Sequence, residues 1–169
     1  MKLQMNCFNC YTEFHITRSK SLCPNCGDMT TSKKGDYQFP PREGFVLTHF
    51  LTLSDVKQSA DFYHRVFGGK IVLEGEPTII EIANSWVILN VGGGPTDDKP
   101  TVTLRTPHNP NEVSSFMNIR VADIQSCYDE WRKRGAEFLT EPKDHQFEIR
   151  AYIRDPDGHL IEVGQSKTV

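Results

Sequence analysis

Four cysteines near the start of the chain are the residues whose spacing most clearly indicates chemistry. They form two pairs, Cys7 with Cys10 and Cys23 with Cys26, each with two intervening residues. Each pair can present two thiolates to one ion, and two such pairs complete a closed tetrahedral zinc site. We therefore expect a structural Zn²⁺ bound by Cys7, Cys10, Cys23 and Cys26, with no coordination position open for catalysis.

The two cysteine pairs, the second followed by Gly27, resemble the zinc ribbon family over about residues 5–30. A redox role for each pair is the alternative, and it is disfavoured because there are two pairs and no βαβ pattern around either. We assign residues 1–35 to the ribbon. The polar, proline-containing residues 36–44 are the expected linker.

Length and composition limit the class of the whole protein. The 169 residues, 37% of them hydrophobic, fit one ordinary core plus a small appended module. Residues 1–45 carry six Lys and Arg against four Asp and Glu, whereas residues 46–169 carry thirteen against eighteen. Neither part has the dense basic surface that drives binding to nucleic acid. No apolar stretch reaches the roughly 20 residues of a membrane span.

Residues 45–167 show the pattern of one βαβββ module repeated, at about 45–92 and 113–167. Each copy has a helix with an apolar stripe at helical spacing, preceded by an aspartate that can cap it, Asp55 or Asp123. Short β-rich stretches flank the helices. Strands are expected at 45–53, 70–73, 78–82, 86–91, 115–121, 137–139, 148–153 and 159–163.

The paired modules and the turn Asp155-Pro156-Asp157-Gly158 resemble the vicinal oxygen chelate superfamily, over about residues 45–167. This superfamily contains glyoxalase I, extradiol dioxygenases, fosfomycin-resistance transferases and bleomycin-binding proteins. The resemblance implies an α+β fold in which paired βαβββ modules form a cup-shaped sheet. It also implies a divalent metal held by a His on the first strand and a Glu on the last strand of modules, although the fold does not determine the reaction.

The resemblance places a ligand site in the cup. Glu162 aligns with the carboxylate ligand of the last strand, and Tyr152 matches a position that points into the cup. Strand alternation then puts Arg150 on the same face as Tyr152. The expected lining, to which Trp86 is a further candidate, consists of Thr48, Asn90, Phe116, Asn118, Arg120, Arg150, Tyr152 and Glu162.

The set of metal ligands that the resemblance implies is incomplete. Phe116 stands where the second module should supply a histidine, and a phenyl ring cannot bind a metal. The equivalent position of the first module is Thr48, one residue before His49. Strict alternation sends His49 to the helix-packed face, whereas a β-bulge would turn it into the cup, and both alternatives stay open. A second divalent metal, held by His49 and Glu162, is therefore not the favoured expectation.

Three functions follow from these observations. The favoured one is a protein that binds a small organic ligand in the cup without the catalytic metal of the superfamily. The alternative is a metal-dependent lyase or dioxygenase of the glyoxalase type, so the sequence leaves open whether the protein is an enzyme. The third is an adaptor in which the zinc ribbon binds a protein partner and the cup senses a metabolite.

The sequence also gives expectations for the location and the oligomeric state of the protein. The first residues lack the apolar core of a secretory signal, so we expect a cytoplasmic protein with reduced cysteines and no membrane partner. Members of the superfamily commonly pair through open sheet edges, so we expect a homodimer.

The zinc hypothesis predicts the effect of a chelator. About 30 residues bury too little surface to fold unaided, so metal removal should unfold residues 1–35 alone. Amide NMR spectra before and after complete zinc removal measure this. Dispersed signals from residues 1–35 in the zinc-free protein would contradict the hypothesis.

Overall fold

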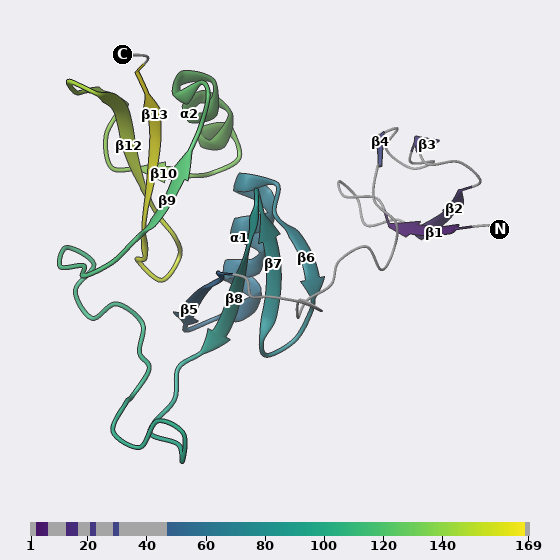
Figure 1. Cartoon of the computed structure of the whole chain (residues 1–169), viewed down its shortest axis with the longest axis vertical. Helices are drawn as coiled ribbons and strands as arrows, with labels where there is room; N and C mark the ends of the chain where they lie inside the picture. Colours follow the sequence, from purple (N-terminus) through teal and green to yellow (C-terminus); the bar gives the residue numbers. More distant parts are fainter. Residues whose placement is uncertain (1–2, 7–12, 17–20, 23–28, 31–46, 168–169) are drawn as a thin grey trace. The chain divides into compact units, whose positions relative to one another are not determined.

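The computed structural model describes residues 3–6, 13–16, 21–22, 29–30 and 47–167. The chain divides into two compact units, residues 1–46 and residues 47–169 (Figure 1).

The first unit contains two small antiparallel pairs of strands. Strand β1 (Leu3–Asn6) pairs with β2 (Glu13–Ile16), and β3 (Ser21–Leu22) pairs with β4 (Met29–Thr30). Each cysteine pair falls, in sequence, between the two strands of one such pair. The four cysteines of the predicted zinc site and the predicted linker lie outside the described residues, so the zinc ribbon stays a prediction.

The second unit consists of two modules that begin in the same way, with a strand, a helix and then further strands. The first module consists of β5 (His49–Leu53), α1 (Val56–Phe67), β6 (Lys70–Leu73), β7 (Thr78–Ile82) and β8 (Ser85–Val91). The second consists of β9 (Met117–Arg120), α2 (Ile124–Lys133), β10 (Glu137–Phe138), β11 (Lys143–Asp144), β12 (Glu148–Arg154) and β13 (Leu160–Ser166).

Both modules form a mixed sheet in which the first strand pairs in parallel with the last. The strand orders are β5-β8-β7-β6 and β9-β13-β12-β10. The expected helices and strands are therefore found, in the arrangement typical of a βαβββ module. Some bounds differ from the expectation: β5 begins at His49 rather than at 45, β9 begins at Met117 rather than at 115, and β13 runs to Ser166 rather than to 163. The short strand β11, which pairs with β12, was not expected. Its two polar residues carry no apolar alternation that could have indicated a strand.

The helix ends follow from their capping residues. Asp55 accepts a hydrogen bond from the backbone N–H of Gln58 at 2.9 Å, and Asp123 accepts one from Ser126 at 3.0 Å. Gly68 ends α1 with a φ of 68°, a left-handed conformation that glycine adopts without strain.

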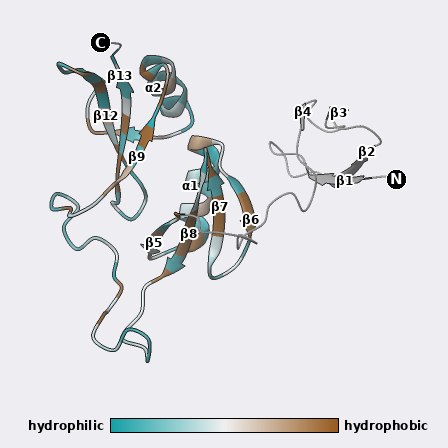
Figure 2. Ribbon diagram, viewed as in Figure 1, coloured by the Kyte–Doolittle hydropathy of each residue, from teal (hydrophilic) through white to brown (hydrophobic). Residues whose placement is uncertain are grey.

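The helices and the inner faces of both sheets share one hydrophobic core. Its largest fully buried side chains belong to both modules and include Tyr63, Leu89, Ile153 and Ile161. Phe67 of α1 meets Trp131 of α2 edge to face, with ring centroids 4.9 Å apart. Apolar residues therefore gather on the strands and helices, whereas the long connection between the modules is mainly hydrophilic (Figure 2). No helix in the described ranges has the length and apolar character of a membrane span.

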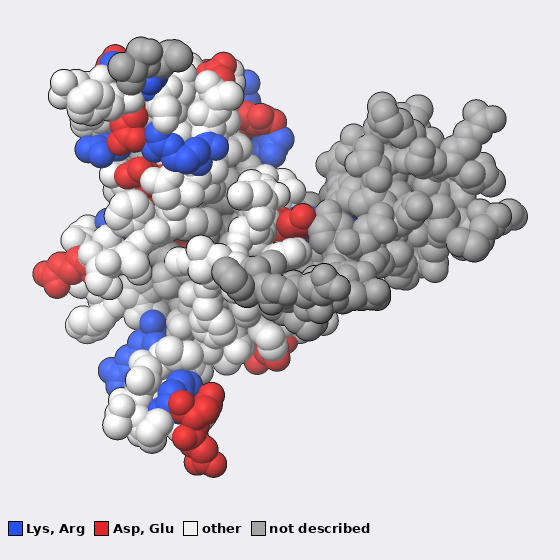
Figure 3. Space-filling view, in the orientation of Figure 1, with Lys and Arg blue, Asp and Glu red and all other residues white. Residues whose placement is uncertain are grey.

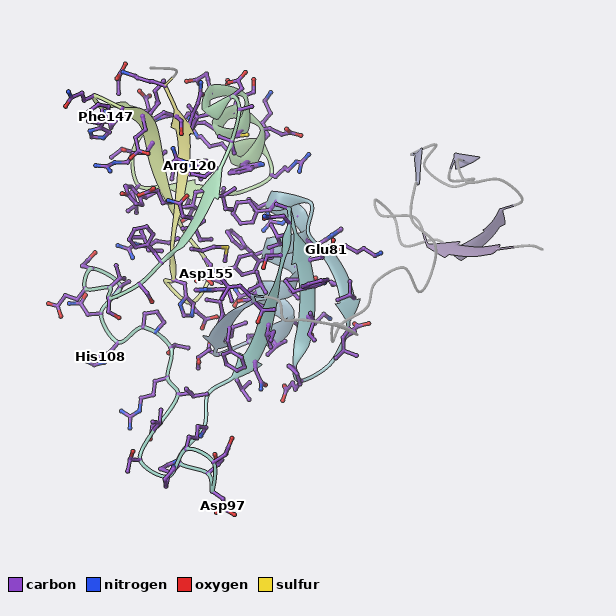
Figure 4. All side chains as sticks on the ribbon, viewed as in Figure 1. Glu81, Asp97, His108, Arg120, Phe147 and Asp155 are labelled. Atoms are coloured by element: carbon purple, nitrogen blue, oxygen red, sulfur yellow. The ribbon has the colours of Figure 1, made fainter. Side chains whose placement is uncertain are left out.

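The turn between β12 and β13 joins the second module to the first. Asp157 Oδ1 accepts hydrogen bonds from the backbone N–H and the hydroxyl of Ser54, at 2.8 and 2.6 Å. Asp157 Oδ2 accepts one from Ser59 at 3.1 Å, and Asp155 accepts one from the Tyr63 hydroxyl at 2.8 Å. Figure 4 shows Asp155 between the two modules. We call these five residues the inter-module contact.

Burial makes the inter-module contact sensitive to the loss of a partner. Asp155 is 5% exposed and Tyr63 is fully buried. Burial raises the pKa of the Asp155 carboxyl, and burial together with the charge of Asp155 raises the pKa of the Tyr63 hydroxyl well above its usual range. The neutral hydroxyl therefore remains the donor to Asp155.

Replacing Tyr63 by Phe should destabilise the second unit. The change keeps the ring but removes the donor to a buried carboxyl, which costs about 1–3 kcal/mol. The free energy of unfolding in urea measures it. Tyr128→Phe is the matched control, because the Tyr128 hydroxyl accepts from Arg132 in a partly exposed position. Equal stability changes in the two variants would contradict a special contribution of the bond between Tyr63 and Asp155.

Candidate functional site

Three neighbouring residues of the second sheet share the face opposite the core. Strand β13 runs between β9 and β12, and its Glu162 lies opposite Asn118 on one side and Tyr152 on the other. Residues opposite one another on neighbouring strands point to the same face. We call the face that carries Asn118, Tyr152 and Glu162 the polar face.

Glu162 is the most buried charged group of the polar face. The residue is 6% exposed. Its Oε1 accepts a hydrogen bond from Asn118 Nδ2 at 2.5 Å, and its Oε2 accepts one from the Tyr152 hydroxyl at 2.6 Å. The bond to Glu162 is the main cause of the raised pKa of Tyr152. Both oxygens of the carboxylate therefore have a neutral donor.

Two residues further along the strands, on the same face, two arginines flank a glycine. Gly164 of β13 lies opposite Arg120 of β9 and opposite Arg150 of β12. A Cβ at Gly164 would overlap the Arg120 guanidinium, so the absence of a side chain lets Arg120 extend across β13. Figure 4 shows Arg120 on β9, beside the hairpin formed by β12 and β13.

The carboxylate of Glu148 connects the two arginines. Arg120 Nη1 lies 2.7 Å from Glu148 Oε2, and Arg150 Nη1 lies 3.2 Å from Glu148 Oε1. Hydrogen bonding and attraction from Arg120, together with Arg150, lower the pKa of Glu148. Arg120 also lies 3.8 Å from Glu162 and donates to Ser166 at 2.9 Å. Oppositely charged side chains lie next to one another where β12 and β13 run (Figure 3).

Phe116 forms the apolar border of the polar face. It directly precedes β9, is 44% exposed, and meets the Tyr152 ring edge to face with centroids 6.3 Å apart. A phenyl ring thus stands beside the hydroxyl donor of Glu162. The face therefore combines aromatic surface with fixed polar groups.

A cavity of about 680 Å³ lies beside β9. It is lined in part by residues of the predicted site, with apolar side chains from both modules around them. The predicted residues among its lining are Thr48, His49, Trp86, Asn118 and Arg120. Because Asn118 and Arg120 also belong to the polar face, the cavity and the polar face are continuous.

His49 stands at the start of β5 in unbroken register with β8, opposite Val87. It therefore shares the face of Leu51 and Leu53, without the bulge that would turn it. Burial, followed by the charge of His159, lowers its pKa. His159 is half-buried, and its Nε2 lies 2.8 Å from the carbonyl oxygen of Thr52.

The described residues do not fit the metal site that the resemblance implies. Within them, no three His, Cys, Asp or Glu side chains lie close enough together to hold a metal ion. Phe116 offers no lone pair. Asn90 shares its face with Thr52 of the first module and accepts from the backbone N–H of Val91 at 2.9 Å. Glu162, the one aligned carboxylate, already accepts two hydrogen bonds.

Glu148 and Gly164 are the site residues that the sequence interpretation missed. Strand alternation places Glu148 on the face of Arg150 and Tyr152, so the same rule that selected those residues could have found it. Arg150 pairs with Glu148, whereas Glu162 accepts hydrogen bonds from Asn118 and Tyr152.

Comparison with known proteins agrees with this architecture. Residues 46–163 match the family model described as the Glyoxalase/Bleomycin resistance protein/Dioxygenase superfamily, and the chain belongs to this superfamily. A metallothiol transferase FosB of Shouchella clausii is 28% identical over 116 residues, which cover 66% of this chain and 73% of that protein. A lactoylglutathione lyase of Neisseria meningitidis is 24% identical over 132 residues, covering 73% and 91%.

Solved structures show the same fold at lower identity. The fosfomycin resistance protein FosX of Mesorhizobium loti has a TM-score of 0.54 and 16% identity, over 74% of this chain and 93% of that chain. TnmS3 of Streptomyces sp. CB03234, an antibiotic binding protein, has a TM-score of 0.52 and 18% identity, over 75% and 99%. These similarities establish the fold and not the activity.

Gly164→Ala should displace Arg120 without unfolding the sheet. The added methyl group would overlap the guanidinium, which is the flexible end of its side chain, and alanine stabilises a compatible backbone by about 0.4–1 kcal/mol. The Arg120 Nε–Hε NMR signal should shift while the melting temperature is maintained. Gly93→Ala is the control, since a Cβ there meets nothing within 4 Å. An unchanged Arg120 signal would contradict the packing of Arg120 over Gly164.

Proposed function

We propose that this protein binds a small organic ligand on the polar face and in the adjoining cavity, without a catalytic metal. The proposal rests on the hydrogen bonds that Glu162 accepts. Asn118 and Tyr152 each donate a hydrogen bond to one of its oxygens, at 2.5 and 2.6 Å. A metal ion at Glu162 would have to compete with these donors, and with the Arg120 guanidinium 3.8 Å away, for a carboxylate that is 6% exposed.

The composition of the surroundings supports an organic ligand. Ligand pockets are mostly apolar, with a few placed polar groups that fix the orientation of the guest. The cavity beside β9 has this composition, with Ile82 and Trp86 among its apolar lining and Asn118 and Arg120 among its polar lining. Its volume of about 680 Å³ lies within the usual range for small-molecule sites.

The relatives favour a second candidate, a metal-dependent enzyme. Metallothiol transferase and lactoylglutathione lyase are the names of proteins that share 24–28% of their aligned residues with this chain. Such a site would need Glu162, His49 and at least one further ligand, because catalytic zinc sites use about three protein ligands. A measurement of metal content separates the two candidates.

Glu162→Gln and His49→Ala should leave the metal content of the purified protein unchanged. Any zinc then belongs to the four N-terminal cysteines, and elemental analysis should show its loss when these are replaced by serine. A stoichiometric divalent metal that survives the cysteine replacements but disappears with Glu162→Gln would establish the metal-dependent enzyme instead.

A further inference from the structure

The two arginines that flank Gly164 are not equivalent. Arg120 donates to Glu148 and Ser166 and lies near Glu162, so several of its N–H groups have partners. For Arg150, the described residues provide one partner, Glu148, through Nη1. Its side chain is 37% exposed. A guanidinium has five N–H donors, so most donors of Arg150 remain available to a guest.

The carboxylate of Glu148 occupies the position between these guanidiniums. It meets Arg120 at 2.7 Å through one oxygen and Arg150 at 3.2 Å through the other. Charge-assisted hydrogen bonds of this kind are how arginine side chains bind oxyanions. Two positive groups thus face the carboxylate of Glu148, and Arg120 lies farther from Glu162, at 3.8 Å.

The ion pairs of Glu148 are suited to exchange. The side chains of Arg120, Arg150 and Glu148 are 43%, 37% and 24% exposed. Partly exposed ion pairs contribute little to stability because water competes with them. Glu148 is also the first residue of β12, next to the 68% exposed Phe147, so its side chain can turn into solvent without disturbing the core.

We infer that Arg120 and Arg150 form an oxyanion subsite for the acidic group of the ligand, and that the carboxylate of Glu148 fills this subsite when no ligand is bound. The inference rests on the proposed function and specifies its ligand class: an organic acid with a carboxylate or sulfonate group and an aromatic or apolar body. Phe116 and the ring of Tyr152 provide the apolar surface for that body. An incoming acid replaces Glu148 between the guanidiniums, and Glu148 turns outward.

Two fluorescent probes of nearly the same shape test the inference on the full chain. One is 8-anilinonaphthalene-1-sulfonate, and the other is N-phenyl-1-naphthylamine, which lacks the sulfonate. Glu148→Gln should bind the sulfonate about threefold more tightly than the wild type, the factor expected for removing one partly exposed competing ion pair. Arg150→Gln should bind it about tenfold more weakly, the loss of one charge-assisted hydrogen bond.

The neutral probe and two further variants serve as controls. N-phenyl-1-naphthylamine should bind the wild type, Glu148→Gln and Arg150→Gln alike. Lys133→Gln removes an exposed positive charge at the end of α2 and should change neither affinity. Phe116→Ala should weaken both probes, because it removes apolar surface from the site.

The possible results separate the two claims. If Phe116→Ala weakens both probes but Glu148→Gln and Arg150→Gln bind the sulfonate like the wild type, the oxyanion subsite is wrong and the proposed function stands. If Phe116→Ala changes the affinity of neither probe, the organic-ligand site is itself wrong. If Glu148→Gln bound both probes more tightly by the same factor, the gain in affinity would not depend on the sulfonate charge of the probe. That result would also overturn the subsite.

Discussion

A carboxylate that is 6% exposed, as Glu162 is, must be compensated by donors from its immediate surroundings. The two donors come from different strands, Asn118 from β9 and Tyr152 from β12. Both reach Glu162 because the parallel register with β9 and the antiparallel register with β12 place them directly opposite it. A shift of either register by one residue would turn the donor to the core and leave the charge without compensation.

The inter-module contact fixes the hairpin that carries Glu162 and Tyr152. Asp155 and Asp157, at the turn between β12 and β13, are held by side chains of the first module, including Tyr63. The corresponding turn of the first module, between β7 and β8, consists of Ala83 and Asn84, with Ala83 at a positive φ of 53°. The two modules share a topology, but the carboxylate turn belongs to the second alone. The hairpin that carries Glu162 and Tyr152 is therefore held by the first module through this turn.

The sequence allowed the elements and much of the polar face to be predicted, because both depend on short-range rules. The capping residue Asp55 and apolar spacing predicted α1, and alternation placed Arg150 on the face of Tyr152. These rules could not predict which side chains form hydrogen bonds and ion pairs with one another. Arg120 of β9 reaches Glu148 of β12 across β13 because Gly164 has no side chain. This contact depends on the order in which the three strands lie in the sheet. Short-range rules could not predict the contact between His159 and Thr52 either, since the two residues lie 107 positions apart in sequence.

The polar face thus combines two kinds of electrostatic interaction with different consequences. Glu162 is compensated by two neutral donors, with Arg120 3.8 Å away, under low solvent exposure, where loss of a partner leaves a buried charge and is costly. Glu148 is compensated by two cations that are about two-fifths exposed, where water and dissolved ions can replace a partner at little cost. The buried carboxylate is therefore suited to hold the three strands in register. The partly exposed carboxylate of Glu148, two residues from Arg150 on the same face, is suited to exchange its partners with a guest.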